Sequence, residues 1–129
     1  MPLYKRALAA SVRVLGNDHP DTLTSRNNLA SAYESAGDLD RAIPLYKRAL
    51  AASVRVLGND HPDTLTSRNN LAGAYESAGD LDRAIPLYER TLADCLRVLG
   101  DDHPLTVTVR GNSAAARANP DGRPLPNSP

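Results

Sequence analysis

Residues 44–85 read PLYKRALAASVRVLGNDHPDTLTSRNNLAGAYESAGDLDRAI, and residues 2–43 are the same sequence with one change, Ser31 in place of Gly73. The two copies agree at 41 of 42 positions. A third copy opens at Pro86 and matches 16 of its first 25 residues before it diverges. A fixed period of this length is typical of repeat proteins, in which each repeat is one supersecondary unit that stacks on its neighbours.

Each period contains two stretches with helical spacing. From Leu39 to Leu57, small and apolar residues recur every three or four positions, which indicates one buried helical face. Asp38 suits the N-cap of this helix and Gly58 suits its C-terminal end. The other helix starts near Pro62, and the short joint at Gly79 makes the two helices antiparallel. The spacing predicts helices over 2–15, 20–36, 39–57, 62–78, 81–99 and 104–117.

Proline occurs inside two of these predicted helices. Pro44 and Pro86 fall about six residues after the helix starts, where proline removes a backbone hydrogen bond and costs about 3 kcal/mol. We expect a kink at these positions and no helix boundary.

Composition and charge narrow the function classes. The chain has 129 residues and no formal net charge, which argues against binding to nucleic acid or to an anionic membrane. Phe and Trp are absent, so we expect an aliphatic core of Ala and Leu with a little Val. One Cys excludes an internal disulfide, and no apolar run is long enough for a membrane span. We expect a soluble, cytoplasmic, helix-rich protein.

Few residues suggest chemistry. His19, His61 and His103 each stand between Asp and Pro, one repeat apart, so they are too far apart to share a metal ion; we expect each to shape a helix entry. Cys95 falls at a mid-helix packing position. No nucleotide-binding, hydrolase or metalloprotease motif occurs, and we expect no enzyme and no cofactor. The recurring charges are expected on a solvated face, and they include Glu34, Asp40, Arg41, Lys47, Arg48 and Arg55.

The stretch NNLASAYESAGDLDRAIPLYKRAL, residues 27–50, resembles the tetratricopeptide signature. Its small, aromatic and turn residues match the family at Ala30, Tyr33, Gly37, Ala42, Tyr46 and Ala49. The 42-residue period and the connector VLGNDHPDTLTS are similar to kinesin-light-chain-type repeats, which also occur in bacterial regulatory proteins. One departure is that Arg26 and Arg68 stand where the family usually has a large apolar residue.

The resemblance implies an all-α, right-handed solenoid of antiparallel helix pairs. With the first helix of a family repeat called A and the second called B, the chain runs B-A-B-A-B-A. Residues 1–117 form the array, with repeats 2–43, 44–85 and a partial 86–117. The tail, 118–129, is rich in proline, and we expect it to be disordered. Its RPLPNSP segment also fits a loose SH3-ligand spacing.

The resemblance further implies a non-catalytic scaffold that binds a protein or an extended peptide in a concave groove lined by the A helices. The groove positions carried onto this chain are Thr24, Asn27, Asn28, Ser31, Glu34, Ser35, Thr66, Asn69, Asn70, Gly73, Glu76, Ser77, Thr108 and Asn112, with Arg26, Arg68 and Arg110 as possible flanking residues. An asparagine amide both donates and accepts, so it can hold a peptide backbone. The competing interpretation is that the asparagines bond only neighbouring helices.

Two alternatives to this function stay open. The chain is either a structural module that stacks head-to-tail or a fragment of a larger regulatory protein. The last predicted helix has polar Ser113 and Arg117 where the second copy has Leu71 and Tyr75, which suits a terminal cap. We therefore expect a monomer or weak end-to-end association.

Overall fold

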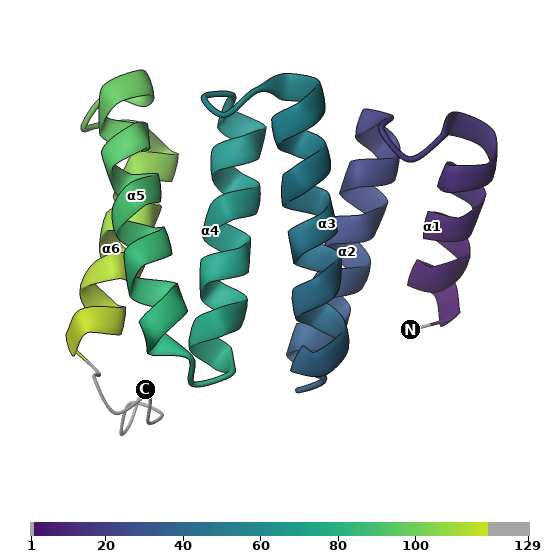
Figure 1. Cartoon of the computed structure of the whole chain (residues 1–129), viewed down its shortest axis with the longest axis horizontal. Coiled ribbons are helices and arrows are strands. Elements are labelled where there is room, and N and C mark those ends of the chain that lie inside the picture. The colour runs from purple at the N-terminus through teal and green to yellow at the C-terminus, as the bar shows by residue number, and fades with distance from the viewer. Residues whose placement is uncertain (1, 119–129) are drawn as a thin grey trace. The chain divides into compact units, whose positions relative to one another are not determined.

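The structure, a computed structural model, describes residues 2–118 (Figure 1). Within this range the chain is all α-helical, with six helices. They are α1 (Pro2–Leu15), α2 (Pro20–Ser35), α3 (Leu39–Leu57), α4 (Pro62–Ser77), α5 (Leu81–Leu99) and α6 (Pro104–Ala118). Every predicted helix is confirmed to within one residue at each end. The predicted tail lies outside the described residues except for Ala118, which ends α6.

The helix limits follow from local chemistry. Asp38 caps α3, with its Oδ1 accepting a hydrogen bond from the backbone nitrogen of Arg41 at 3.3 Å. Gly58 follows α3 with φ 88°, a left-handed value that glycine adopts without steric cost. Both α3 and α5 continue through their internal prolines, Pro44 and Pro86, as expected.

The chain divides into two compact units, residues 1–67 and residues 68–129, with the boundary inside α4. In the first unit, α2 packs between α1 and α3. In the second unit, α5 packs on α6. Within each unit the helices that are joined by a short connection run antiparallel (Figure 1).

The core is less aliphatic than the sequence indicated. Tyr33 and Tyr46 are buried in the first unit, and Tyr75 and Tyr88 are buried in the second. Alanines such as Ala30, Ala42 and Ala84 are fully buried as well. The small alanines let the helices approach closely, and the tyrosine rings fill the remaining volume. None of the helices in residues 2–118 is long and apolar enough to cross a bilayer.

Candidate functional site

The A helices carry a row of small and polar residues that are exposed or half-buried. On α2 these are Thr24, Asn28, Ser31 and Ser35, whose spacing of four, three and four residues keeps them on one side of the helix. In the second unit the corresponding row is Asn70, Gly73 and Ser77 on α4, with Thr108 and Asn112 on α6. We call these residues the polar stripe of each unit. Thr66 on α4, which precedes the unit boundary, is also exposed.

Two of the predicted groove residues hold the helix pairs together. Glu34 accepts a hydrogen bond from the Tyr46 hydroxyl at 2.8 Å, and Glu76 accepts one from Tyr88 at the same distance. Burial and the neighbouring Glu34 carboxylate raise the pKa of Tyr46 well above its ordinary range. These glutamates therefore serve packing between an A helix and the B helix that follows it.

The asparagines divide into two kinds. Asn112 donates from Nδ2 to Oδ1 of Asn69 at 3.3 Å, so in the second unit this pair joins α4 to α6. The Oδ1 atom of Asn27 is buried and has no hydrogen-bond partner in the part of the chain that the structure describes. The interpretation that asparagines bond neighbouring helices therefore holds for Asn69 and Asn112. Asn28 is exposed and Asn70 is half-buried on the stripe.

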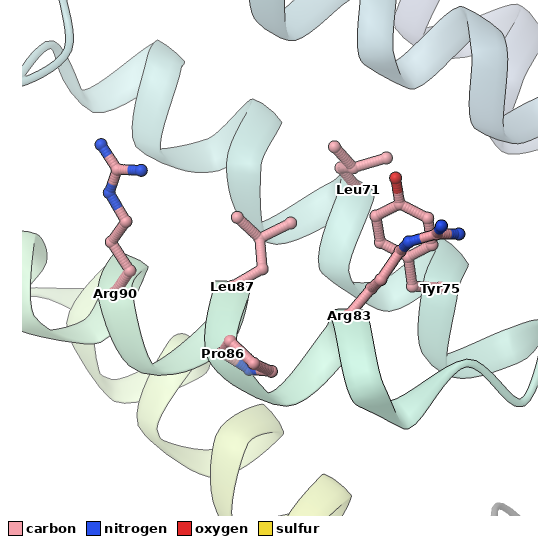
Figure 2. A pocket seen from close by; sticks show the side chains of 6 residues that line it. All are labelled: Leu71, Tyr75, Arg83, Pro86, Leu87 and Arg90. Carbon is pink, nitrogen blue, oxygen red and sulfur yellow. The ribbon is translucent and has the colours of Figure 1, made fainter.

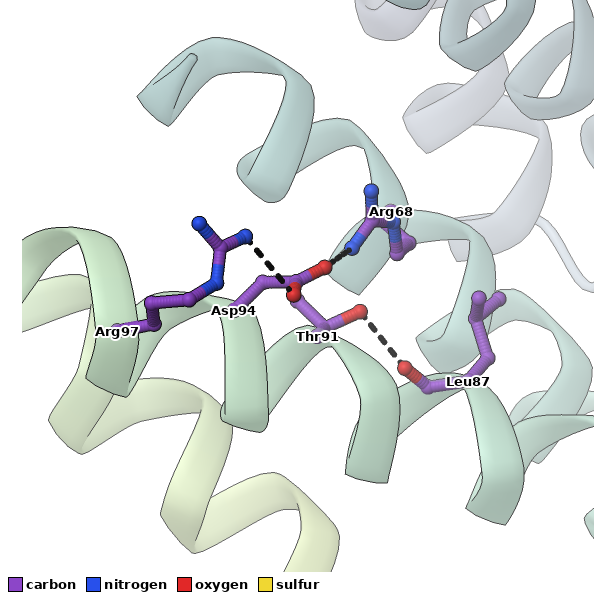
Figure 3. A network of polar contacts seen from close by, with 5 residues as sticks. All are labelled: Arg68, Leu87, Thr91, Asp94 and Arg97. Atoms are coloured by element: carbon purple, nitrogen blue, oxygen red, sulfur yellow. Dashed lines mark hydrogen bonds and ion pairs between the residues drawn. The ribbon is translucent and has the colours of Figure 1, made fainter. Parts of the chain in front are cut away.

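Arg26 and Arg68, two of the possible flanking residues, make hydrogen bonds to other side chains of their own unit. Both are buried, at 8% and 3% exposure. Arg68 donates from Nη1 to Oδ2 of Asp94 on α5 at 2.6 Å, and Arg97 donates to the other oxygen of Asp94 at 3.3 Å (Figure 3). The carboxylate of Asp94 thus draws the Arg68 head toward the B helix.

The same network shifts the acidity of Asp94. Burial alone would raise the pKa of its carboxyl, but the hydrogen bonds from Arg68 and Arg97 hold that pKa below its ordinary value. Sequence reasoning missed Asp94, although the replacement of Ala52 by an acid in the third copy was a visible signal.

The remaining flanking candidate, Arg110, is exposed, and its Nη2 lies 3.7 Å from Oδ1 of Asp101.

The histidines are structural, as expected. His19 Nδ1 accepts a hydrogen bond from the backbone nitrogen of Asp21 at 3.1 Å, and His61 and His103 make the same contact one and two repeats later, each at 3.0 Å. Each histidine therefore caps the first turn of an A helix. Cys95 is fully buried, as its predicted packing position requires, and burial raises the pKa of its thiol.

Each unit also contains a pocket that sequence reasoning missed. In the second unit, a pocket of about 380 Å³ is lined by Leu71, Tyr75, Arg83, Pro86, Leu87 and Arg90 (Figure 2). In the first unit, the equivalent residues line a pocket of about 330 Å³, together with Asp40. At about 100° of rotation per residue, Leu29 and Tyr33 project from the side of α2 roughly opposite the polar stripe. The pockets and the stripe are therefore separate surfaces.

The family of the chain is shown by comparison with known proteins. A tetratricopeptide repeat model matches residues 2–53 and 36–96, so the chain belongs to the tetratricopeptide repeat family. Its helices are arranged like kinesin-light-chain-type repeats. A kinesin light chain of Podosopora anserina with nearly identical TPR-like repeats is 30% identical, with a TM-score of 0.82 over 89% of this chain and 55% of that one.

Two further solved structures agree with this fold. A single-residue variant of the Podosopora anserina protein is 29% identical, with a TM-score of 0.78 over 91% of this chain and 55% of that one. BtubC (BKLC) from P. vanneervenii is 24% identical, covers 99% of this chain and 59% of that one at a TM-score of 0.68, and supports the fold alone. This chain spans a little over half the length of these relatives. No curated protein sequence matches it at a significant level.

Proposed function

We propose that the chain is a non-catalytic scaffold that binds a protein or an extended peptide along the polar stripes of its A helices. The exposure of Asn28 on α2, with half-buried Asn70 one repeat later, is the observation that carries this proposal. Their amides can donate to and accept from a peptide backbone, whatever its side chains. Membership of the tetratricopeptide family supports the proposal, because solenoids of this type offer extended surfaces for protein partners.

The stripe favours a neutral peptide backbone as the ligand. Among the stripe residues none is charged, and the nearby Arg26 and Arg68 are buried. A peptide held through its backbone can vary in side chains, so we expect a partner recognised by extended conformation.

The test begins with a partner isolated by pull-down with the purified chain. Affinity for that partner is then measured for a double variant, Asn28→Ala with Asn70→Ala, and for Arg13→Ala on the exposed part of α1 as a matched surface control. We expect the double variant to lose about tenfold in affinity, because it removes two hydrogen-bonding amides, while the control keeps its affinity. Unchanged affinity in a double variant with an unchanged thermal melt would contradict a binding role for the stripe.

The second candidate function is structural self-association, and one observation favours it. Tyr4 on α1 is 46% exposed, whereas the equivalent Tyr46 and Tyr88 are 3% and 2% exposed because an A helix covers each of them. A helix from a second copy that covers Tyr4 would extend the array end to end.

A further inference from the structure

One buried arginine recurs in the two units, but a carboxylate accompanies it in only one of them. In the second unit, Arg68 is 3% exposed and donates to Asp94 on α5 (Figure 3). In the first unit, Arg26 is the same residue one repeat earlier and is 8% exposed. The position that corresponds to Asp94 is Ala52 on α3, which has no polar side chain. The first unit therefore lacks the acid that pairs with this arginine in the second.

Arg26 has a neutral partner instead. Its Nη2 donates to Oδ1 of Asn17 at 3.2 Å, and no carboxylate of residues 2–118 lies within ion-pair distance of its guanidinium. Asp18 acts on Arg26 through its charge, but its two carboxylate oxygens are held by Arg55. A buried cation without an anion in contact is costly, because a neutral acceptor restores only part of the lost hydration.

Neighbouring arginines add positive charge to the same region. Burial lowers the pKa of Arg26 most, the charge of Arg48 lowers it further, and Asp18 and Arg55 act in opposite directions. Three positive charges thus stand against one negative charge around Arg26. The region attracts an anion, and it favours one that carries more negative charge than a single chloride.

A small ion can reach the place where the first unit lacks its carboxylate. In the second unit the side chain of Asp94 is 22% exposed, so solvent reaches its carboxylate. The two helices that carry Asp94 and Ala52 have the same length, and their residues correspond one repeat apart. The equivalent place in the first unit is therefore next to solvent, and there Ala52 supplies only a methyl group.

We propose that the first unit binds inorganic phosphate at the Arg26 guanidinium, in the place that the Asp94 carboxylate takes in the second unit. Two oxygens of phosphate can accept parallel hydrogen bonds from one guanidinium, as a carboxylate does. Arg26 is two residues, or about 200° of helix, from both Thr24 and Asn28 of the polar stripe. The site is therefore separate from the stripe and goes beyond the function proposed above.

The probe is sodium phosphate at neutral pH, titrated into the full ¹⁵N-labelled chain, with sodium chloride as the balancing salt at constant ionic strength. We expect saturable NMR shifts of the Arg26 side chain and the Ala52 backbone. We expect none at Arg68 and Asp94, because a carboxylate already pairs with that arginine. The melting temperature should also rise with phosphate, since an ion that binds only the folded chain stabilises it.

Two substitutions exchange the situations of the two units. Ala52→Asp installs the missing carboxylate, so it should raise the melting temperature without phosphate and weaken phosphate binding at Arg26 about tenfold or more. Asp94→Ala removes the carboxylate of the second unit, so it should create a new saturable phosphate response at Arg68.

Each substitution has a control that changes the net charge equally. Ala51→Asp, at the exposed neighbouring position of α3, should keep the phosphate response of Arg26. Asp101→Ala, whose side chain is 81% exposed, should create no response at Arg68.

Several results would overturn the proposal. These are no saturable shift at Arg26, the same shift when chloride alone is raised, an unchanged response in Ala52→Asp with an equal or higher melting temperature, or an equal loss in Ala51→Asp. If Ala52→Asp lowers the melting temperature, the response of Arg68 in Asp94→Ala decides, and its absence refutes the proposal. Shifts confined to Asn28 would place the ion on the stripe and would refute the Arg26 site as well.

Discussion

At the scale of single residues, the most informative feature is an arginine in a position suited to an apolar side chain. Arg68 is nearly fully buried, and a buried cation is strongly unfavourable unless a hydrogen-bonded anion accompanies it. Asp94 meets that requirement in the second unit. In the first unit, Arg26 relies on the side-chain oxygen of Asn17 and on the more distant Asp18.

We expect Asp94→Ala to lower the free energy of unfolding by about 2 kcal/mol, because it leaves Arg68 buried without its carboxylate. Chemical denaturation followed by circular dichroism measures this. The control is Asp101→Ala, whose side chain is 81% exposed and 3.7 Å from Arg110. An exposed pair of this kind contributes about 0.5 kcal/mol or less. Equal losses in the two variants would show that the buried ion pair adds nothing to stability.

At the scale of helices, the repeat depends on how each helix ends. Gly58 has φ 88° and ψ 166°, a backbone conformation that is strained for any residue with a side chain. A Cβ atom at this position would meet no atom within 4 Å, so strain and not crowding makes glycine necessary there. Gly111 also has open space around it, but it lies inside α6 and has no left-handed φ.

Alanine substitutions at these two glycines should therefore have opposite signs. We expect Gly58→Ala to destabilise the chain by about 2 kcal/mol through backbone strain. We expect Gly111→Ala to stabilise it by about 0.5 to 1 kcal/mol, because alanine is the better helix former. Thermal melts of both variants measure the effect. Destabilisation by both would mean that α6 needs the small side chain for a contact.

At the scale of the whole molecule, the question is how an array of repeats meets other chains. Each helix pair buries its apolar side against neighbouring helices, so stability is a sum of nearest-neighbour terms. Within residues 2–118, α1 has large exposed apolar side chains at Leu3, Tyr4 and Val14. On α6, Ser113 is 2% exposed, and its Oγ has no hydrogen-bond partner among residues 2–118. Arg117 pairs with Glu89 at 3.2 Å within the second unit.

We expect a monomer in dilute solution with weak association as the concentration rises, measured by light scattering. Tyr4→Glu should reduce this association, because it places a charge on the exposed side of α1. Val107→Glu introduces the same charge at a 53% exposed position of α6, so its effect on association can be compared with that of Tyr4→Glu. A tetramer or larger assembly that is independent of concentration would contradict the expectation.

Much of the fold follows from local signals in the sequence. The helix limits are set by residues within one turn of them, such as His19 before Pro20 and Asp38 before Leu39. The side chains of these two residues accept hydrogen bonds from backbone nitrogens in the first turn of the helix that follows. The 42-residue period predicted the alternation of A and B helices, because each period contains the local start and end signals of two helices. The stripe residues were among the positions that the family resemblance carries onto the chain, and the structure leaves them exposed or half-buried.

The sequence by itself determined the family, because the repeated signature is visible in it. It also determined the six helices and their ends, because these depend on contacts between residues close in the chain. Only the tertiary structure decided which polar groups serve the fold: Arg68 pairs with a residue 26 positions away, and Glu34 bonds to one 12 positions away. It alone revealed the pockets, since each forms between two helices. Helical spacing gives the direction of a side chain from its own helix, whereas its partner depends on which helix packs there and how closely.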